Sequence, residues 1–308
     1  MTTWLVTGGC GFIGSHLVDA LRGRGDRVRV LDDLSSGRRE NIPADVEFWQ
    51  GDVADERAVA EALDGVAGCF HLAAVASVQR CTDAWVASHR ANLTGTIVVL
   101  NGARSANGGM PVPVVYASSA AVYGDNETVP LKESAATVPL SAYGADKLSC
   151  EMQARIAWSA YGLPSVGLRF FNVYGPRQDP SSPYSGVIAI FADRLRRRRE
   201  IDIFGDGLQT RDFIYVADVV AYLLAAMELP RIGARVLNVC TGRATSVLQL
   251  AHLMGELFGT QPTIRHRPAR SGDIRRSIGD PGAVISALGF AAGTEMSEGL
   301  KLTLGAIR

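Results

Sequence analysis

A glycine-rich turn near the amino terminus constrains the fold of this chain more than any other feature. An apolar run at 4–7 leads into Thr7-Gly8-Gly9-Cys10-Gly11-Phe12-Ile13-Gly14, and an amphipathic pattern typical of a helix follows over about 12–24. Glycines at this spacing tighten the turn and let backbone N–H groups approach a pyrophosphate at the amino end of the helix. Ordinary strand–helix turns can also carry this spacing, so its surroundings have to support the interpretation.

That support is an acidic residue at the end of the second predicted strand, 27–31. Asp32 lies eighteen residues beyond Gly14. A carboxylate there accepts hydrogen bonds from the adenosine ribose hydroxyls and repels a 2′-phosphate, so NAD is favoured over NADP. Asp33 can share or take this role. Arg38-Arg39 can in principle meet a phosphate, which leaves NADP as the alternative.

Strand and helix patterns alternate through the first 170 residues. Further strand-like runs lie at 46–49, 68–72, 112–117 and 165–169, and further helical patterns at 55–64, 84–106 and 143–161. This alternation predicts an α/β fold with a doubly wound, Rossmann-like parallel sheet covered by helices on both faces. We expect residues 1–172 to form the dinucleotide-binding domain, to which a strand near 236–240 returns. Residues 173–308 are expected to form mainly a smaller α/β substrate-binding cap.

Charge and cysteine content bound the possible partners. Lys and Arg total 31 and so do Asp and Glu, which argues against nucleic acid and anionic membranes as partners. The arginine run 196–199 is interpreted as a solvated helix end, with a phosphate contact as the alternative. Five scattered cysteines without Cys-x-x-Cys spacing indicate free thiols in a reducing compartment. Since no signal peptide, membrane span or metal-ligand spacing is recognisable, we expect a cytoplasmic protein without a metal.

Tyr143 and Lys147 stand four residues apart in the predicted helix 143–161. Residues at this spacing share one helix face, with Cβ atoms roughly 5–6 Å apart. An ammonium held this close favours the phenolate form of the tyrosine, which can then exchange a proton with a substrate hydroxyl while a nicotinamide exchanges the hydride. Such pairs also arise by chance on exposed helix faces, so the neighbouring segments decide.

With those segments included, the chain resembles the extended short-chain dehydrogenase/reductase family, and within it the UDP-hexose 4-epimerases. The resemblance covers nearly the whole length. Beyond the glycine turn and the Tyr143/Lys147 pair, it rests on segments 71–74 (HLAA), 92–96 (NLTGT), 118–124 (SSAAVYG), 169–176 (RFFNVYGP), 205–213 (GDGLQTRDF) and 270–273 (RSGD).

The resemblance implies roles for individual residues. Ser119 would hydrogen-bond the substrate 4-hydroxyl, Tyr143 would be the acid/base, and Lys147 would bind the nicotinamide ribose. The expected NAD-binding residues are Gly8, Gly11, Phe12, Ile13, Gly14, Asp32, Asp33, Asp52, Val53, Leu72, Ala73, Ala74, Asn92, Ser118, Tyr143, Lys147 and Phe170. The expected UDP-sugar-binding residues are Ser77, Ser119, Tyr143, Asn172, Val187, Phe204, Arg211, Arg270, Asp273 and Ser277.

The residues after Ser119 separate the reactions of similar enzymes. The 4,6-dehydratases that this chain resembles place Asp-Glu there to eliminate water, and UDP-glucuronate decarboxylases carry a glutamate. Ala120 and Ala121 can move no proton. The resemblance therefore implies oxidation at C4 to a 4-keto sugar, rotation of that sugar, and return of the hydride to its other face.

Substrate choice is expected to depend on the position seven residues beyond Arg270. In similar epimerases a tyrosine there leaves room only for a hydroxyl, whereas a small residue admits an N-acetyl group. Ser277 therefore predicts that UDP-GlcNAc and UDP-GalNAc are accepted along with UDP-Glc and UDP-Gal. If the loop is offset by one residue, Arg276 or Ile278 forms the wall instead.

Three other functions are weighed against this prediction. A UDP-glucuronate 4-epimerase would use Arg80, Arg275 or Arg276 to pair with the C6 carboxylate, and a net reductase would consume added NADH. A non-enzymatic NAD sensor would be expected to lack the serine, tyrosine or lysine that this chain retains. By resemblance, helices 84–106 and 143–161 also predict a homodimer.

Overall fold

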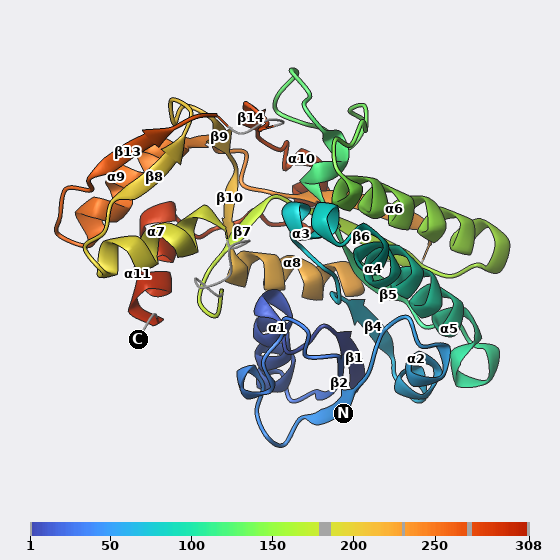
Figure 1. The fold of residues 1–308 in the computed structure, drawn as a ribbon. Coiled ribbons are helices and arrows are strands. Elements are labelled where there is room, and N and C mark those ends of the chain that lie inside the picture. Colours follow the sequence, from blue (N-terminus) through green and yellow to red (C-terminus); the bar gives the residue numbers. More distant parts are fainter. Residues whose placement is uncertain (1, 179–185, 230–231, 270–272, 307–308) are drawn as a thin grey trace.

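The computed structural model describes residues 2–178, 186–229, 232–269 and 273–306 (Figure 1). Seven parallel strands form its main sheet, in the order β11-β6-β5-β4-β1-β2-β3. Their bounds are β1 (Thr3–Thr7), β2 (Arg27–Asp32), β3 (Glu47–Gln50), β4 (Gly68–His71), β5 (Val114–Ser119), β6 (Ser165–Phe170) and β11 (Ala234–Val239). The predicted doubly wound α/β fold is confirmed.

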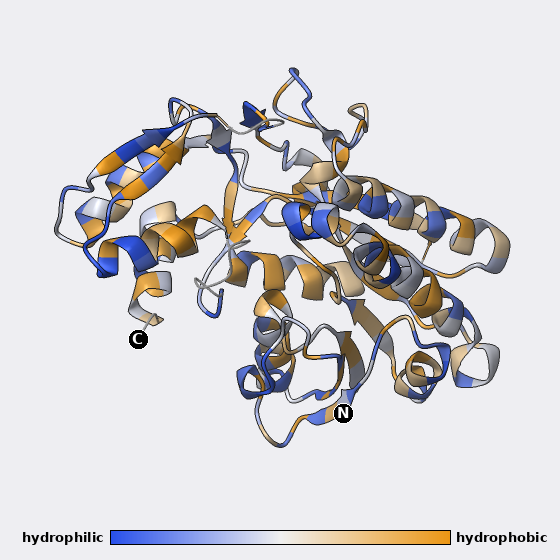
Figure 2. Cartoon of the chain, in the orientation of Figure 1, coloured by the Kyte–Doolittle hydropathy of each residue, from blue (hydrophilic) through white to orange (hydrophobic). Residues whose placement is uncertain are grey.

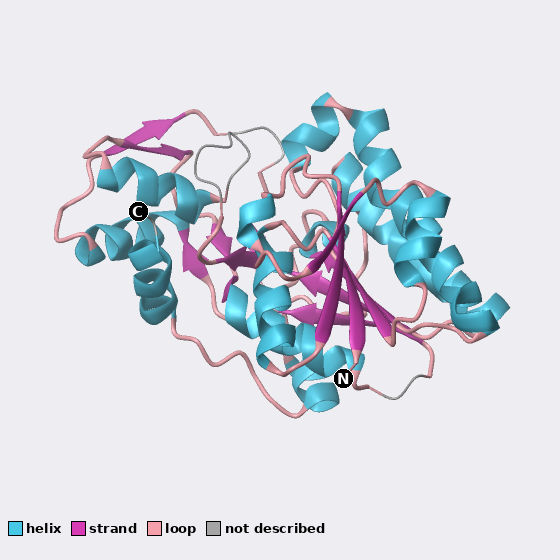
Figure 3. Ribbon diagram, turned by 90° about the horizontal axis from the view of Figure 1, so that it is seen from below, coloured by secondary structure: helices cyan, strands magenta, loops and turns pink. Residues whose placement is uncertain are grey.

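Helices cover both faces of this sheet (Figure 3). α1 (Phe12–Gly23) and α8 (Val216–Met227) pack on one face, and α2 (Glu56–Leu63), α5 (Gly95–Gly109) and α6 (Ala142–Tyr161) pack on the other. Side chains alternate along β1: Trp4 and Val6 join the first apolar cluster, whereas Leu5 joins the second. The apolar colouring of the strands agrees with a sheet buried on both faces (Figure 2).

The helix predicted at 84–106 is interrupted. α3 (Val78–Asp83) and α4 (Trp85–His89) come first, and a π-helical turn, η2 (Arg90–Thr94), joins α4 to α5. A π turn shifts the side chains that follow it around the helix, which periodicity does not reveal, and such turns are frequent at functional sites. Asn92 lies in this turn.

Most of the later elements build the cap (Figure 1). They are β7 (Asn172–Tyr174), α7 (Val187–Arg196), β8 (Ile201–Phe204), β9 (Thr210–Arg211), β10 (Phe213–Tyr215), β12 (Thr245–Ser246), α9 (Val247–Leu257), β13 (Ile264–Arg267), β14 (Arg276–Ser277) and α11 (Met296–Ala306). α10 (Gly282–Leu288) instead packs on α8 and β11 of the Rossmann-like part. α7, α9 and β8 bury Phe191, Ile201, Leu250 and Met254 in an apolar cluster of their own. The chain crosses between the two parts more than once, because β11 pairs with β6 and α8 packs on the sheet. The division at residue 172 stays a prediction.

Neither a membrane-spanning helix nor a metal-binding cluster occurs among the described residues. None of their helices is both long and apolar enough to cross a bilayer. They also contain no group of three or more His, Cys, Asp or Glu side chains that could hold a metal ion. The five cysteines are all buried and unpaired, as the sequence predicts.

Candidate active site

The candidate site lies where the strand order of the sheet reverses. From β1 the chain moves outward to β2 and β3, then returns to add β4 on the other side of β1. Crevices at the carboxyl ends of strands on either side of such a switch point are where doubly wound proteins bind ligands. The glycine turn follows β1, Asp32 ends β2, and the Leu72–Ser77 loop follows β4.

The glycine turn has the shape that a dinucleotide needs. A Cβ added to Gly14 would lie 2.2 Å from the Gly8 carbonyl oxygen, and one added to Gly8, whose φ is +69°, would lie 2.6 Å from the Ala73 nitrogen. Only glycine therefore lets the turn, α1 and the loop after β4 pack this closely. α1 begins at Phe12, with Gly11 as its N-cap and no side chain on its first amides. These amides suit a pyrophosphate.

Asp32 is the buried acid at the end of β2. Its Oδ2 accepts a hydrogen bond from the Cys10 amide and its Oδ1 from the Leu34 amide, both at 2.9 Å. Burial raises the pKa of Asp32, and the two amide hydrogen bonds lower it. Asp33 is exposed and accepts from the Ser35 amide. Of the two carboxylates, Asp32 thus has the fixed geometry expected of a ribose ligand.

Two other polar side chains predicted near the adenosine bind the protein itself. Arg39 donates to the Ile42 carbonyl at 3.1 Å and lies 5.0 Å from the Phe48 ring centroid. Asp52 accepts from Arg90 at 3.1 Å, and both side chains are partly exposed. Binding of NAD by Asp52 and Val53 stays a prediction, whereas the position of Arg39 gives no support to NADP.

Ser119, Tyr143 and Lys147 come from two neighbouring elements. Buried Lys147 donates from Nζ to the Ala117 carbonyl at 2.9 Å, and Nζ lies 5.9 Å from the Tyr143 ring centroid. Ala117 precedes Ser119 by two residues in β5. A Cβ on Gly144 would lie 2.6 Å from the carbonyl oxygen of Ala121, so the first turn of α6 packs directly on the segment after Ser119. That segment is the 3-10 helix η3 (Ala120–Tyr123).

His71 ends β4 and is fully enclosed. Its Nδ1 lies 2.7 Å from Thr7 Oγ1 and its Nε2 lies 3.1 Å from Thr96 Oγ1. The Thr96 hydroxyl donates to the Asn92 carbonyl at 2.6 Å, so it can only accept from His71, which assigns the proton to Nε2. Burial, followed by the Lys147 charge, lowers the pKa of His71 from 6.5 to about 3. A neutral His71 at the end of β4 therefore joins β1 to the first turn of α5, and the Thr96 hydroxyl continues this network to the π turn.

Several predicted ligand-binding side chains are held by protein groups. Asn92 Oδ1 accepts from the Val75 amide at 2.8 Å, which fixes the loop after β4. Ser77 Oγ accepts from the Arg80 amide at 3.1 Å and caps α3. Ser118 Oγ donates to Glu151 at 2.6 Å. Contacts of these residues with NAD or sugar stay predictions.

The cap brings four predicted substrate-binding residues together. Arg211 donates from Nη2 to Asp273 Oδ1 at 2.6 Å and from Nη1 to the Ile274 carbonyl. Ser277 pairs with Arg211 across β9 and β14. Gln209 donates to the Phe204 carbonyl at 2.9 Å and to Asp273 at 3.5 Å. Gln209 was missed as a site residue, although its place two residues before Arg211 was a signal.

Three further residues predicted to bind the substrate are Asn172, Val187 and Arg270. Asn172 is the first residue of β7, and its backbone N–H donates to the Asp212 carbonyl. Val187 is the first residue of α7. Arg270 lies outside the described residues, as do Ser271 and Gly272. Their ligand contacts stay predictions.

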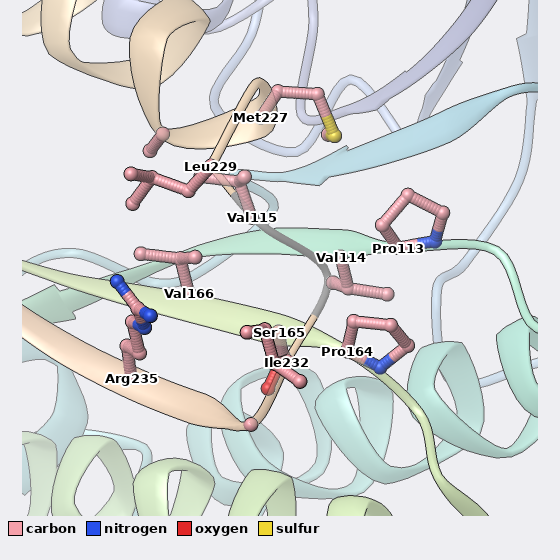
Figure 4. Close-up of a pocket in the computed structure, with 12 residues that line it drawn as sticks. Pro113, Val114, Val115, Pro164, Ser165, Val166, Met227, Leu229, Ile232 and Arg235 are labelled. Atoms are coloured by element: carbon pink, nitrogen blue, oxygen red, sulfur yellow. The ribbon is translucent and has the colours of Figure 1, made fainter. Parts of the chain in front are cut away.

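A separate small pocket lies at the opposite, amino end of β5 and β6 (Figure 4). Its side chains are mostly apolar, among them Pro113, Val115, Pro164 and Met227. Of its lining residues only Ser165 and Arg235 carry a polar side chain, and neither is a usual acid/base near neutral pH. This pocket is therefore not the candidate active site.

Comparison with known proteins identifies the family of this chain. The sequence profile of the NAD dependent epimerase/dehydratase family matches residues 4–240. A UDP-glucose 4-epimerase of Mycolicibacterium smegmatis is 37% identical over 97% of this chain and 96% of its own length.

Two solved structures share the whole fold. A Thermotoga maritima UDP-glucose 4-epimerase, solved with UDP-glucose, is 39% identical with a TM-score of 0.93, covering 99% of this chain and 98% of its own. A UDP-N-acetylglucosamine 4-epimerase from Methanobrevibacter ruminantium, in complex with UDP-N-acetylmuramic acid, is 33% identical with a TM-score of 0.93, covering 99% and 97%. The chain therefore belongs to the NAD dependent epimerase/dehydratase family, which confirms the resemblance drawn from its sequence and NAD as its cofactor.

Proposed function

We propose that this protein interconverts the C4 epimers of UDP-hexoses, and that it accepts UDP-GlcNAc and UDP-GalNAc along with UDP-Glc and UDP-Gal. The observation that carries the proposal is the pairing of Tyr143 and Lys147 on α6 with a β5 strand that ends in Ser119 and continues as Ala120-Ala121. Similarity to 4-epimerases over nearly the whole chain supports it.

Each side chain has a defined task in this reaction. Ser119 orients the C4 oxygen, and Tyr143 takes the proton of the C4 hydroxyl and later returns it. Lys147, fixed by its hydrogen bond to the Ala117 carbonyl, places its positive charge beside the Tyr143 ring. Bound NAD supplies the acceptor and later the donor of a hydride at C4.

The side chains after Ser119 favour epimerisation over elimination. Dehydration and decarboxylation of a 4-keto sugar need a further acid or base next to the sugar, and alanine methyl groups transfer no proton. Return of the hydride to the keto sugar is the step that these side chains favour. Since NAD is regenerated in each cycle, we expect it to stay bound through turnover.

The position of Ser277 supports the wider substrate range. Ser277 is partly buried and pairs with Arg211, the proposed ligand of the UDP pyrophosphate. Arg276, the offset alternative, is exposed and donates to the Glu127 carbonyl at 2.8 Å. A small hydroxymethyl side chain beside the diphosphate site leaves space for an N-acetyl group on the sugar.

UDP-glucuronate 4-epimerase activity remains the second candidate. Of the arginines considered for its carboxylate, Arg275 forms a two-bond ion pair with Asp206 at 2.7 and 2.9 Å. This pair lowers the pKa of Asp206 to about 2, chiefly through the hydrogen bond from Arg275. Arg275 is thus engaged by a carboxylate of the protein, which disfavours this candidate.

A substrate panel tests the proposal. The protein is incubated separately with UDP-Glc, UDP-GlcNAc and UDP-glucuronate, and the C4 epimers are resolved by NMR. We expect conversion of the first two without added NAD or NADH. Conversion of UDP-glucuronate alone would establish the second candidate, a dehydrated ketone as final product would refute epimerisation, and inactivity of NAD-loaded protein would favour a sensor.

We further propose that the protein is a homodimer. Trp85 and Val86 on α4, Ile97 on α5, and Met152 and Ile156 on α6 are apolar side chains that are at least 40% exposed. Apolar groups gathered on neighbouring helices favour burial against another protein surface. Light scattering should give twice the mass of one chain, and Ile156→Glu should give monomers, whereas Leu302→Glu on α11 should not.

A further inference from the structure

A buried ion pair joins the helix of the candidate acid/base to the strand beside Ser119. Glu151 is 1% exposed and Arg169 is 5% exposed. Arg169 donates from Nε and Nη2 to the two carboxylate oxygens of Glu151, at 2.8 and 2.7 Å. Glu151 follows Lys147 by four residues and Tyr143 by eight, so all three lie on one side of α6.

The same pair holds the chain on both sides of Ser119. Before Ser119, the Ser118 hydroxyl donates to Glu151 Oε1 at 2.6 Å. After it, Arg169 Nη1 donates to the Tyr123 hydroxyl at 2.8 Å, and the Tyr123 hydroxyl donates to Asn238 Oδ1 at 2.6 Å. Tyr123 is the last residue of η3, which starts directly after Ser119. Ser119 thus lies in a segment fixed at each end.

A buried ion pair is a costly way to join a helix to a strand. Removing two charges from water opposes folding, and apolar residues of equal volume often stabilise a protein as well or better. The ion pair instead fixes the orientation of α6 relative to β6, because two parallel hydrogen bonds between a guanidinium and a carboxylate restrict their geometry. This fixed orientation extends to the segment 119–122, because each charged group also forms a hydrogen bond with a hydroxyl next to that segment.

We propose that Glu151 and Arg169 are positioning residues, which fix Ser119 relative to Tyr143 and Lys147 through Ser118 and Tyr123. This inference rests on the proposed function, because it assigns Ser119 to the reacting oxygen. In this role Glu151, Arg169 and Tyr123 touch neither substrate nor NAD. Ser118 is also predicted to bind NAD, but its hydroxyl donates to Glu151. The proposed effect of all four groups on the reaction passes through the place of Ser119.

Two mild substitutions test this role. Ser118→Ala and Tyr123→Phe each remove one hydroxyl and leave the ion pair in place. The matched control is Thr303→Ala, which removes an equally buried hydroxyl bond, to the Gly299 carbonyl at 2.7 Å, in α11 of the cap. All variants are made in the wild type and in Ser119→Ala, and kcat and KM for UDP-Glc are measured in both backgrounds.

We expect Ser118→Ala and Tyr123→Phe each to lower kcat roughly tenfold in the wild type, as misplacement by a fraction of an ångström does. KM should change less than about twofold, because the UDP contacts lie on the cap. In Ser119→Ala both effects should nearly vanish, since groups that act through one residue are not additive. Equal losses of kcat in both backgrounds, or a loss confined to KM, would overturn the proposal.

Hydrogen exchange provides a readout without catalysis. Amides of 118–124 should exchange faster in Ser118→Ala and Tyr123→Phe than in the wild type or Thr303→Ala. Unchanged exchange there refutes the positioning role. If the wild type converts no UDP-hexose, the proposed function fails, but exchange still decides whether these hydroxyls hold the segment around Ser119.

Discussion

At the scale of single residues, the hydroxyl of Tyr143 is the group on which the proposed chemistry depends most. We expect Tyr143→Phe to lower kcat by about 10²–10⁴-fold, because the C4 hydroxyl loses its proton acceptor while the ring packing stays. Tyr161→Phe, at the exposed end of the same helix, should keep wild-type activity. NMR rates of UDP-Glc conversion check both variants, and a Tyr143→Phe enzyme of normal rate would contradict the assignment.

His71 predicts how stability depends on pH. Its pKa is lowered from 6.5 to about 3, so between these values the unfolded chain binds a proton that the folded chain does not. Protonation therefore favours unfolding, and the free energy of unfolding should fall as pH drops below 6.5, by up to about 1.4 kcal/mol per pH unit. This contribution is fully present only above pH 6.5.

Denaturant unfolding at several pH values tests this prediction. In His71→Gln the slope of unfolding free energy against pH should become shallower, even though the variant is less stable. His252→Gln, at an exposed position on α9, should keep the wild-type slope. Parallel slopes for all three proteins would show that His71 does not titrate as predicted.

At the scale of elements, alanine substitutions of the two glycines in α1 are expected to have opposite effects. A Cβ at Gly14 would clash with the Gly8 carbonyl, whereas a Cβ at Gly23 meets no atom within 4 Å. Gly14→Ala should displace the turn and abolish retention of NAD. Gly23→Ala should stabilise the protein by about 0.5–1 kcal/mol, because alanine loses less backbone entropy in a helix.

Nicotinamide absorbance of the purified proteins and thermal melting measure these two effects. A Gly14→Ala protein that keeps its NAD would mean that the turn does not cradle the pyrophosphate.

The pairing of β9 with β14 gives the second prediction at this scale. In Ser277→Tyr a large ring replaces the hydroxymethyl group beside Arg211. We expect kcat/KM for UDP-GlcNAc to fall by about 10²-fold, while that for UDP-Glc changes less than about threefold, since one clash in a pocket costs a few kcal/mol. UDP-Glc is the internal control, and equal losses on both substrates would refute a gatekeeper role.

At the scale of the whole molecule, Asp212 ties β9 and β14 of the cap to the main sheet. It is completely buried between β9 and β10. Its carboxylate accepts from the Thr241 amide and hydroxyl at 2.8 and 2.7 Å, from the Gly242 amide at 2.8 Å, and from the Gly279 amide at 3.3 Å. These groups follow β11 and β14, so one side chain fixes Arg211 and Ser277 to the Rossmann-like part.

We expect Asp212→Asn to destabilise the protein by about 3 kcal/mol, because an amide cannot accept all four hydrogen bonds. KM for UDP-sugars should rise, and the retention of NAD should fall by a smaller factor. Asp218→Asn, whose carboxylate accepts from the amides of Gly293 and Thr294, should leave KM unchanged. Melting and steady-state kinetics of both variants make the comparison, and an unchanged KM in Asp212→Asn would contradict the coupling.

Features that depend on neighbours along the chain could be predicted from the amino-acid sequence. The glycine turn, the acid that ends β2, the Tyr143/Lys147 spacing and the alternation of strands and helices are local patterns, set by backbone conformation and by which face is apolar. For the same reason the fold class and the family followed from the sequence.

Which polar groups meet across the fold followed from the three-dimensional packing alone. The hydroxyl of Ser118, the amide of Asn92 and the guanidinium of Arg211 all bond to protein groups on other segments of the chain. The π turn at 90–94 and the Glu151–Arg169 pair belong to the same class of feature. Their energies depend on contacts between residues far apart in sequence, and neither periodicity nor spacing encodes such contacts.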